Sequence, residues 1–369
     1  MIVGNHRPSC LIIDRNAVRQ NIKREQEKLG KDVVIFAVLK ANAYGMGTLE
    51  IAKVAKETGV KGFCVAILDE AIALREAGFK EPILVMGVTD TKDVILASQL
   101  NISLTMPSVA WLEEVSSKKL EKPLNVHVKL DTGMGRIGLI EEDDIQKTLA
   151  IFDKNSQLNL EGLFMHFAKA DSEDLAHFNL QKERFTRMKR FFPDTIKYVH
   201  TSNSAAVIFR DAWGSNMVRF GFSMYGMNPT GKDLKMPYPV ADALSIETAL
   251  THVKQLKKGE SISYGATYYT KSDEWIGTLP FGYGDGFPRT LQAFEVIVEG
   301  EKTPIVGRMC MDQCMIRLPK EYPIGTKVTI VGKNGDQINT LQDVADHANT
   351  ICAELLCRFT DRMPRYYIN

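Results

Sequence analysis

The sequence carries almost no excess charge of either sign. Its 46 lysines and arginines balance 45 aspartates and glutamates, which leaves a formal net charge of +1. Proteins that bind nucleic acid or an anionic membrane surface need a positive field to attract the polyanion. We therefore expect no nucleic-acid partner and no membrane partner.

Long apolar runs and closely spaced cysteine frameworks are also missing. No run approaches the roughly 20 apolar residues that a membrane-spanning helix needs. The first residues, MIVGNHRP, lack the basic-then-apolar order of a signal peptide. The six cysteines are scattered, and their closer pairs have no histidine companions at zinc-finger spacing. We predict a cytoplasmic protein with reduced thiols and no metal site.

At 369 residues the chain exceeds a typical single core, so we expect two domains. Residues 1–237 show short apolar runs that alternate with helical patterns. The predicted strands are Val33–Leu39, Gly62–Ile67, Pro82–Gly87, Ile102–Met106, Leu124–Asp131, Leu160–Phe167, Tyr198–Ser202 and Met217–Phe220. This rhythm predicts an α/β fold with a (β/α)8 TIM-type barrel. An open doubly wound sheet is the alternative, but no G-x-G-x-x-G follows the first strand.

The pattern changes in a segment rich in turn residues, Asn228–Pro239. Beyond it, residues 238–369 predict a mostly antiparallel β domain with one late helix near Leu341–Ala348. Its predicted strands are Leu244–Val253, Trp275–Leu279, Phe294–Val298, Thr303–Val306, Met315–Leu318 and Lys327–Val331. The pattern leaves open whether the first dozen residues of the chain join this domain.

Lys40 ends the apolar run that forms the first predicted strand, directly before a polar turn. Chemistry in a parallel α/β fold is placed at the carboxyl ends of the strands. An apolar setting disfavours the charged form of a lysine, which makes its amine a nucleophile or base near neutral pH. A strand-capping lysine that points into water is the ordinary alternative.

Other strand ends supply a consistent set of groups. They deliver Tyr44 after the first strand, Arg136 after the fifth, His166 after the sixth, Asn203 and Ser204 after the seventh, and Arg219, Gly221 and Phe222 at the eighth. Each has an ordinary structural explanation when taken alone, such as an ion pair or a helix cap. A lysine, backbone amides suited to a phosphate and an arginine at one barrel mouth together fit pyridoxal phosphate.

Six motifs, which span nearly the whole chain in order, closely resemble the signatures of the alanine racemase family. They are Ala37–Gly45 (AVLKANAYG), Asp131–Gly138 (DTGMGRIG), Ser263–Tyr268 (SYGATY), Gly282–Gly286 (GYGDG), Gly307–Gln313 (GRMCMDQ) and Arg362–Arg365 (RMPR). The lysine motif alone would also fit other families with the same barrel, so the combination is what makes the resemblance specific.

The resemblance implies that pyridoxal phosphate is attached to Lys40, which acts as base on one face of the substrate Cα. Tyr264 would act on the opposite face, in the barrel mouth of the partner subunit of a homodimer. Arg219 would hydrogen-bond the pyridine nitrogen, and His166 would link Arg219 towards Tyr264. Because an arginine rarely gives up its proton, the ring nitrogen would stay largely unprotonated, which disfavours side reactions such as transamination.

The resemblance also assigns the remaining positions. Arg136 would contact the cofactor phenolic oxygen and the substrate carboxylate, Met311 would contribute backbone to the carboxylate site, and Tyr283 would line the entrance. The other cofactor-binding positions are Tyr44, Asn203, Ser204, Gly221 and Phe222, all but Asn203 as phosphate ligands. Lys129 matches a lysine that is carbamylated in some relatives and orients Arg136.

Two positions depart from the family pattern. Met46 stands where a histidine is usual, which we interpret as a packing change. Asp361 stands where some relatives have a phosphate-binding tyrosine. Because a carboxylate repels phosphate, we expect Asp361 to turn away or to meet Arg362. Tyr366 and Tyr367 lie close by in sequence and could substitute as phosphate ligands, which we consider the less favoured alternative.

The sequence therefore predicts a pyridoxal-phosphate-dependent alanine racemase that interconverts L- and D-alanine, with a two-base mechanism, and that supplies D-alanine for peptidoglycan. A racemase of broader specificity, acting on serine or other small amino acids, is the first alternative. A non-catalytic pyridoxal-phosphate-binding barrel would not need the second domain with Tyr264, and a decarboxylase on a similar barrel would not be expected to pair arginine with the ring nitrogen.

Overall fold

The computed structural model describes residues 2–369, which fold into two compact units. The barrel unit comprises residues 18–43 and 47–241, and the β unit comprises residues 2–17, 44–46 and 242–369. Two segments from the N-terminal half of the chain therefore belong with the C-terminal strands.

Eight parallel strands form the centre of the barrel unit. They pair in the order β8-β7-β6-β5-β4-β3-β2-β9, and backbone hydrogen bonds from Asn216 to Val199 and from Arg219 to Ser202 link the two ends of this sheet. The strands are β2 (Val34–Val38), β3 (Gly62–Val65), β4 (Ile83–Val85), β5 (Ser103–Met106), β6 (Leu124–Lys129), β7 (Leu158–Phe164), β8 (Tyr198–His200) and β9 (Met217–Phe220). The predicted (β/α)8 barrel is confirmed.

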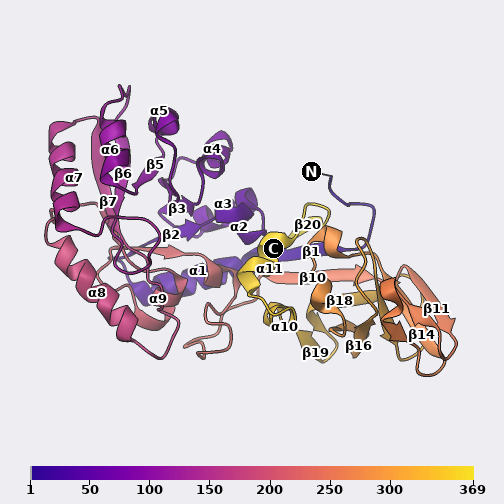
Figure 1. Cartoon of the computed structure of the whole chain (residues 1–369). Coiled ribbons are helices and arrows are strands. Elements are labelled where there is room, and N and C mark those ends of the chain that lie inside the picture. Colours follow the sequence, from indigo (N-terminus) through magenta and orange to yellow (C-terminus); the bar gives the residue numbers. More distant parts are fainter. Residues whose placement is uncertain (1) are drawn as a thin grey trace. The chain divides into compact units, whose positions relative to one another are not determined.

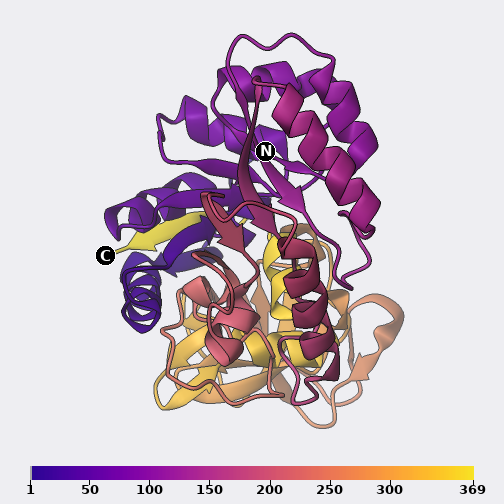
Figure 2. The same cartoon turned by 90° about the vertical axis from the view of Figure 1, so that its left-hand side faces the viewer.

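Helices follow the strands and cover the outside of the barrel, with α7 and α8 in front of the sheet in the turned view (Figure 1 and Figure 2). They are α1 (Arg15–Leu29), α3 (Thr48–Glu57), α4 (Leu68–Glu76), α5 (Val94–Gln99), α6 (Val109–Ser116), α7 (Glu142–Lys154), α8 (Ala176–Lys189) and α9 (Ser204–Arg210). Short 3-10 turns occur at η1 (Thr91–Asp93) and η2 (Phe222–Tyr225). Almost every residue of the barrel strands is buried, as expected for strands covered on both faces.

The β unit is built on one ten-stranded, mostly antiparallel sheet. Its strand order is β11-β14-β17-β16-β15-β18-β10-β1-β20, and β19 pairs with β18. The strands are β1 (Cys10–Asp14), β10 (Leu244–Ala249), β11 (His252–Leu256), β14 (Glu274–Leu279), β15 (Glu295–Val298), β16 (Glu301–Val306), β17 (Cys314–Leu318), β18 (Lys327–Asn334), β19 (Gln337–Asn339) and β20 (Arg365–Ile368). A separate pair joins β12 (Ser261–Ile262) to β13 (Tyr268–Tyr269).

The structure answers the question that the sequence pattern left open about the first residues. β1 pairs antiparallel with β10 and parallel with β20, so it lies inside the sheet of the β unit, and Figure 1 shows it beside β10. The run Leu244–Val253, predicted as one strand, is two: the chain turns after β10, where Leu250 N–H donates to the Thr326 carbonyl, and re-enters the sheet as β11.

Two helices lie in the C-terminal part of the β unit. The predicted helix is present as α10 (Leu341–His347), whereas α11 (Cys352–Arg358) was not predicted. The six cysteines are free thiols. Within the part of the chain that the structure describes, every helix is too short or too polar to cross a bilayer.

Candidate active site

Lys40 opens a left-handed turn, α2 (Lys40–Tyr44), two residues beyond the end of β2. Ala41, Asn42 and Ala43 have φ values of 53°, 54° and 52°. Left-handed helical conformation costs about 1–2 kcal/mol per L-residue, so the surrounding structure must hold this turn in place. Glu70 of α4 does so, because its Oε1 accepts the Ala41 N–H at 2.6 Å.

The same carboxylate also reaches the next strand end. Oε2 of Glu70 accepts the N–H of Ala66, one residue beyond β3, at 2.8 Å. The Glu70 carboxylate therefore links the turn after β2 to the turn after β3. Strained backbone of this kind concentrates at functional sites, where it fixes the direction of a side chain.

A cavity of about 310 Å³ opens at the carboxyl ends of the barrel strands. Charged or polar side chains and apolar residues both line it. The lining residues are Lys40, Lys129, Arg136, His166 and Arg219, with Ala66, Met86, Gly87, Val88, Ile137 and Phe164. Four of the sequence-predicted residues, Lys40, Arg136, His166 and Arg219, are thus brought together.

Arg219 is a buried cation of this cavity, with 2 % of its surface exposed. Its Nη1 donates to the Nδ1 and the carbonyl of His200 at 2.7 and 2.8 Å. Its Nη2 donates to the carbonyls of Met165 and Thr201 at 3.0 and 3.2 Å and to the Nδ1 of His166 at 3.2 Å. Burial lowers the pKa of Arg219 to about 10, so it remains protonated at neutral pH.

His166 is held in its neutral form. Burial lowers its pKa well below the usual value, and the charge of Arg219 lowers it further. Nδ1 faces a fixed donor, Arg219 Nη2, and Asn203 Nδ2 lies 3.4 Å from Nε2. A neutral imidazole accepts the Arg219 hydrogen bond at Nδ1 and carries its own proton on Nε2, whereas a protonated imidazole could not accept it. The positive charge beside His166 is therefore the guanidinium of Arg219.

Lys129 ends β6 and is almost completely buried. Its Nζ donates to the Leu130 carbonyl at 2.7 Å and lies 5.7 Å from the centre of the Phe164 ring. Burial lowers the pKa of Lys129 to about 8, and the charges of Arg219 and Arg136 act in the same direction. A substantial neutral fraction is thus available at mildly alkaline pH. Carbamylation of this amine stays a prediction.

The loop that carries Arg136 is organised by Asp131. Oδ1 of Asp131 accepts the backbone N–H groups of Gly133, Met134 and Gly135 at 2.9–3.0 Å, and Oδ2 accepts that of Arg136 at 3.0 Å. These hydrogen bonds outweigh burial and lower the pKa of Asp131. An aspartate followed within a few residues by two glycines is a typical signal for a turn in which the aspartate side chain accepts hydrogen bonds from the backbone. Asp131 was not among the predicted site residues.

We expect Asp131→Asn to release Arg136 selectively. An Asn oxygen can still accept the three bonds made by Oδ1, whereas its NH2 group would face the Arg136 N–H. A hydrogen bond to a charged group contributes about 1.5–3 kcal/mol, so, with Arg136 in its predicted role at a substrate carboxylate, we expect KM to rise about tenfold or more with a smaller change in kcat. Steady-state kinetics measure this.

The matched control for that variant is Asp174→Asn. Asp174 is an exposed carboxylate that likewise accepts a backbone N–H, that of Ala176 at 3.0 Å, but it does not line the cavity. Its replacement is expected to leave KM unchanged. Equal KM values for both variants and the unchanged protein would remove Asp131 from the positioning of Arg136.

The predicted phosphate ligands of the barrel unit also lie together. Ser204 begins α9, and its Oγ accepts the Gly221 N–H at 3.0 Å. Asn203 caps the same helix by accepting the Ala206 N–H at 2.9 Å, and Phe222 begins η2 directly after Gly221.

Tyr44 belongs to the β unit, where C-terminal side chains hold the residues that follow it. Arg365 Nε donates to the Gly45 carbonyl at 2.6 Å, and the Tyr367 hydroxyl donates to the Met46 carbonyl at 2.9 Å. The hydroxyl of Tyr367 therefore has a structural partner, which argues against its proposed use as a substitute phosphate ligand.

Asp361 pairs with Arg365, whose Nη1 lies 3.3 Å from Oδ1, and not with Arg362, which was one of the two expected outcomes. The reason is that Arg362 is already engaged with two other carboxylates, Asp312 at 2.7 Å and Asp285 at 3.2 Å. The spacing of four residues between Asp361 and Arg365 is compatible with a local ion pair.

Tyr264, Tyr283 and Met311 lie on neighbouring loops of the β unit. Tyr283 N–H donates to the Cys310 carbonyl at 3.2 Å, directly before Met311. Ser263, directly before Tyr264, lies with its Oγ 3.5 Å from the Cys310 Sγ. All three predicted side chains are exposed, by 68, 41 and 52 % respectively. A cluster of exposed apolar side chains is typical of a surface that meets a partner or a ligand.

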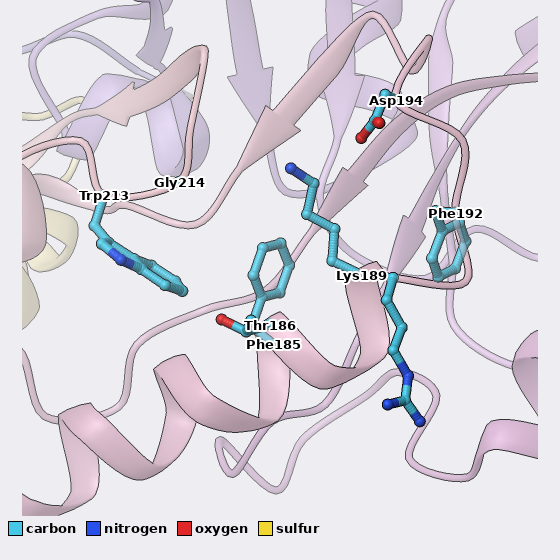
Figure 3. Close-up of a pocket in the computed structure, with 8 residues that line it drawn as sticks. Phe185, Thr186, Lys189, Phe192, Asp194, Trp213 and Gly214 are labelled. Atoms are coloured by element: carbon cyan, nitrogen blue, oxygen red, sulfur yellow. The ribbon is translucent and has the colours of Figure 1, made fainter.

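A second cavity, of about 430 Å³, lies beside α8 (Figure 3). Phe185, Lys189 and Trp213 are among its lining residues, and the predicted site residues are not among them. No cluster of three or more His, Cys, Asp or Glu side chains within residues 2–369 is arranged to hold a metal ion. The barrel-mouth cavity is therefore the candidate active site.

Comparisons with known proteins agree over the whole chain. Residues 13–229 match the family described as alanine racemase, N-terminal domain, and residues 243–367 match alanine racemase, C-terminal domain. The chain is 50% identical over 367 residues to the alanine racemase of Pediococcus pentosaceus, with 100% of this chain and 98% of that protein covered.

Solved structures give the same result. The crystal structure of alanine racemase from E. faecalis has a TM-score of 0.98 and 46% identity, with 100% of both chains covered. A histidine racemase from Leuconostoc mesenteroides subsp. sake has a TM-score of 0.92 and 30% identity, with 99% of both chains covered.

Proposed function

The chain belongs to the alanine racemase family, and from this premise we propose that it interconverts L- and D-alanine with pyridoxal phosphate, using Lys40 and Tyr264 as the two acid–base groups. The observation that carries the proposal is the barrel-mouth cavity, which places Lys40, Arg136, His166 and Arg219 around one space of about 310 Å³.

The residues of this cavity fit pyridoxal phosphate. A lysine lies on a left-handed turn, a protonated arginine is buried at the cavity, and the apolar lining residues suit a flat ring. Ser204 and Gly221, which we assign to the phosphate with Tyr44 and Phe222, are neighbours. Asn203 caps the same helix start and supports this assignment.

When bound, pyridoxal phosphate supplies electron withdrawal that acidifies the substrate Cα–H. In the proposed mechanism, Lys40 Nζ removes or returns the Cα proton on one face, and Tyr264 Oη does so on the other. Arg136 binds the substrate carboxylate, with Met311 backbone beside it, and Tyr283 lines the entrance. Arg219 stays protonated and donates to the ring nitrogen, which restrains side reactions.

The most direct test follows optical rotation after the purified protein is mixed with L-alanine. We expect the rotation to decay to zero, because an unassisted racemase brings both enantiomers to equal concentration. The same endpoint is expected from D-alanine. A constant rotation in the presence of added pyridoxal phosphate would contradict the proposal.

We further propose a homodimer with shared active sites, in which Tyr264 enters the barrel mouth of the partner subunit. The exposed cluster of Tyr264, Tyr283 and Met311 supports this, since three large side chains are presented on one set of loops. In this arrangement the barrel residues within 1–237 hold the cofactor, and residues 238–369 supply the tyrosine.

Mixing inactive variants tests the shared site. After subunit exchange of equal amounts of Lys40→Ala and Tyr264→Phe protein, about half of the dimers are mixed, and each mixed dimer has one intact site. We therefore expect about a quarter of the unmodified activity to return. Absence of recovery, with exchange verified by differently tagged chains, would place both groups in one subunit.

A racemase acting on other amino acids is the second candidate, and the 30% identical histidine racemase supports keeping it. Competition assays with alanine, serine and histidine distinguish the two through their kcat/KM ratios. A role in peptidoglycan supply and the cytoplasmic location stay predictions. Growth of a strain lacking this activity with and without D-alanine tests the first.

A further inference from the structure

A buried chain of hydrogen bonds leads from Arg219 into the interior of the barrel. Arg219 Nη1 lies 2.7 Å from His200 Nδ1, and His200 Nε2 lies 2.8 Å from His127 Nδ1. His127 Nε2 lies 3.2 Å from Oε2 of Glu161. These four side chains come from β9, β8, β6 and β7, and none is more than 6 % exposed.

The donors in this chain have a fixed direction. A guanidinium can only donate, so His200 Nδ1 must accept and the proton of His200 lies on Nε2. His127 then accepts at Nδ1 and carries its own proton on Nε2, which it donates to the Glu161 carboxylate. Burial lowers the pKa of both imidazoles, His200 well below its usual value, so both are neutral.

The barrel strands leave space for this chain of hydrogen bonds. Gly162 stands opposite His127 in the β6–β7 pairing, and a Cβ at Gly162 would lie 2.2 Å from His127 Nδ1. The far end is anchored by two more donors, because Glu161 accepts from Ser103 Oγ at 2.6 Å and from Lys197 Nζ at 3.1 Å. Although burial raises the pKa of Glu161, the His127, Ser103 and Lys197 hydrogen bonds lower it to about 2, so it is ionised.

The other partners of Arg219 explain why a distant carboxylate matters. They are backbone carbonyls and the neutral His166, so none of the groups that it touches carries a negative charge. Two neutral imidazoles polarised in series connect the buried guanidinium to a carboxylate without placing that carboxylate in the cavity. A carboxylate beside the ring nitrogen would favour protonation of that nitrogen. The hydrogen-bond chain through His200 and His127 instead keeps the Glu161 carboxylate away from the ring nitrogen and leaves Arg219 beside it.

We propose that His127 and Glu161 are positioning residues for the reaction, which act through His200 to fix the orientation and proton of Arg219 where it meets the cofactor ring. This inference deepens the proposed function and rests on the assignment of Arg219 to the ring nitrogen. It predicts that a reversal of the donor direction at Glu161 changes the hydrogen bond between His200 and Arg219.

The variant Glu161→Gln is expected to reverse the donor direction along the hydrogen-bond chain. Lys197 Nζ can only donate, so the carboxamide oxygen turns towards it and the NH2 group faces His127 Nε2. His127 and His200 must then carry their protons on Nδ1, and the His200 proton points at Arg219. We expect nitrogen NMR of ¹⁵N-histidine-labelled holoenzyme to show both tautomers switched, and kcat to fall about tenfold with KM changed less than about twofold.

Two further variants make the test specific. Lys197→Ala removes a partner of the other carboxylate oxygen, so the tautomers and kcat should stay as in the unmodified protein. In the double variant Glu161→Gln/Lys197→Ala the carboxamide is free to turn its oxygen to His127, and both readouts should return towards the unmodified values. A purely structural role of Glu161 would not give this rescue.

His127→Phe keeps the ring volume beside Gly162 and removes both nitrogens, which provides a test if Glu161→Gln does not fold. We expect the same loss in kcat and a shifted cofactor absorption band. Unchanged kcat and absorption in Glu161→Gln or in folded His127→Phe would overturn the proposal, whatever the tautomers. Failure of the proposed function is seen separately, because the unmodified protein would then not racemise alanine.

Discussion

Replacing Lys40 by alanine is expected to lower kcat by about 10⁴-fold or more and to remove the cofactor absorption band near the edge of the visible range. The amine has two proposed duties, attachment of pyridoxal phosphate and proton transfer at Cα, and alanine can perform neither. The absorption spectrum of the purified variant with added cofactor and the racemisation rate measure the two losses independently.

The structure supplies a demanding control for this experiment. Lys129 lines the same cavity, and burial lowers its pKa to about 8, so it is the rival amine for cofactor attachment. We expect Lys129→Ala to keep the absorption band. If the band survives in Lys40→Ala and disappears in Lys129→Ala, Lys129 is the anchor. The exposed Lys53, paired with Glu50 on α3, serves as the surface control.

The barrel could be predicted because its strands are local signals. A parallel strand covered on both faces is a continuous apolar run, and β9 was predicted with its observed bounds. The β unit was harder, because its pairings join distant segments. β20 pairs with β1 from the other end of the chain, and no local pattern in Arg365–Ile368 indicates that partner.

In the candidate site, too, the features that depend on local sequence could be predicted and those that depend on distant segments could not. Lys40, Arg136, His166 and Arg219 could be placed from sequence because each lies at or after the end of a recognisable strand, and strand ends converge in a barrel. The groups that hold them were missed. Glu70 lies on the outside helix α4, where a carboxylate normally faces water, and the hydrogen bonds that it accepts from the N–H groups of Ala41 and Ala66 depend on where two strand ends meet.

Buried polar residues on the barrel strands could have served as a signal. His127 and Glu161 interrupt apolar runs, and a buried charge or imidazole needs a partner. The sequence shows that such partners must exist, but not which ones, since the choice depends on register. The bulge between Val126 and His127 in the β6–β7 pairing is a feature that no periodicity predicts.

Tyr264→Phe is expected to keep the cofactor spectrum while lowering kcat in both directions by on the order of 10²–10⁴-fold. The phenylalanine ring preserves shape but cannot take or give a proton. In the proposed mechanism one direction begins with proton removal by Lys40 and the other with removal by Tyr264, so the loss affects different steps. With Cα-deuterated L- and D-alanine, we therefore expect the variant to show unequal primary isotope effects in the two directions.

Tyr269→Phe is the matched control, because Tyr269 is a similarly exposed tyrosine of the β unit, at 58 % against 68 % for Tyr264. Tyr269 belongs to the short strand β13, whereas Tyr264 lies outside that strand, so removing the Tyr269 hydroxyl should leave kcat unchanged in both directions. If Tyr264→Phe and Tyr269→Phe behave alike, the second acid–base group is not Tyr264. The proton on the face opposite Lys40 would then come from another side chain or from water, and equal isotope effects in the two directions would point to a single base serving both faces.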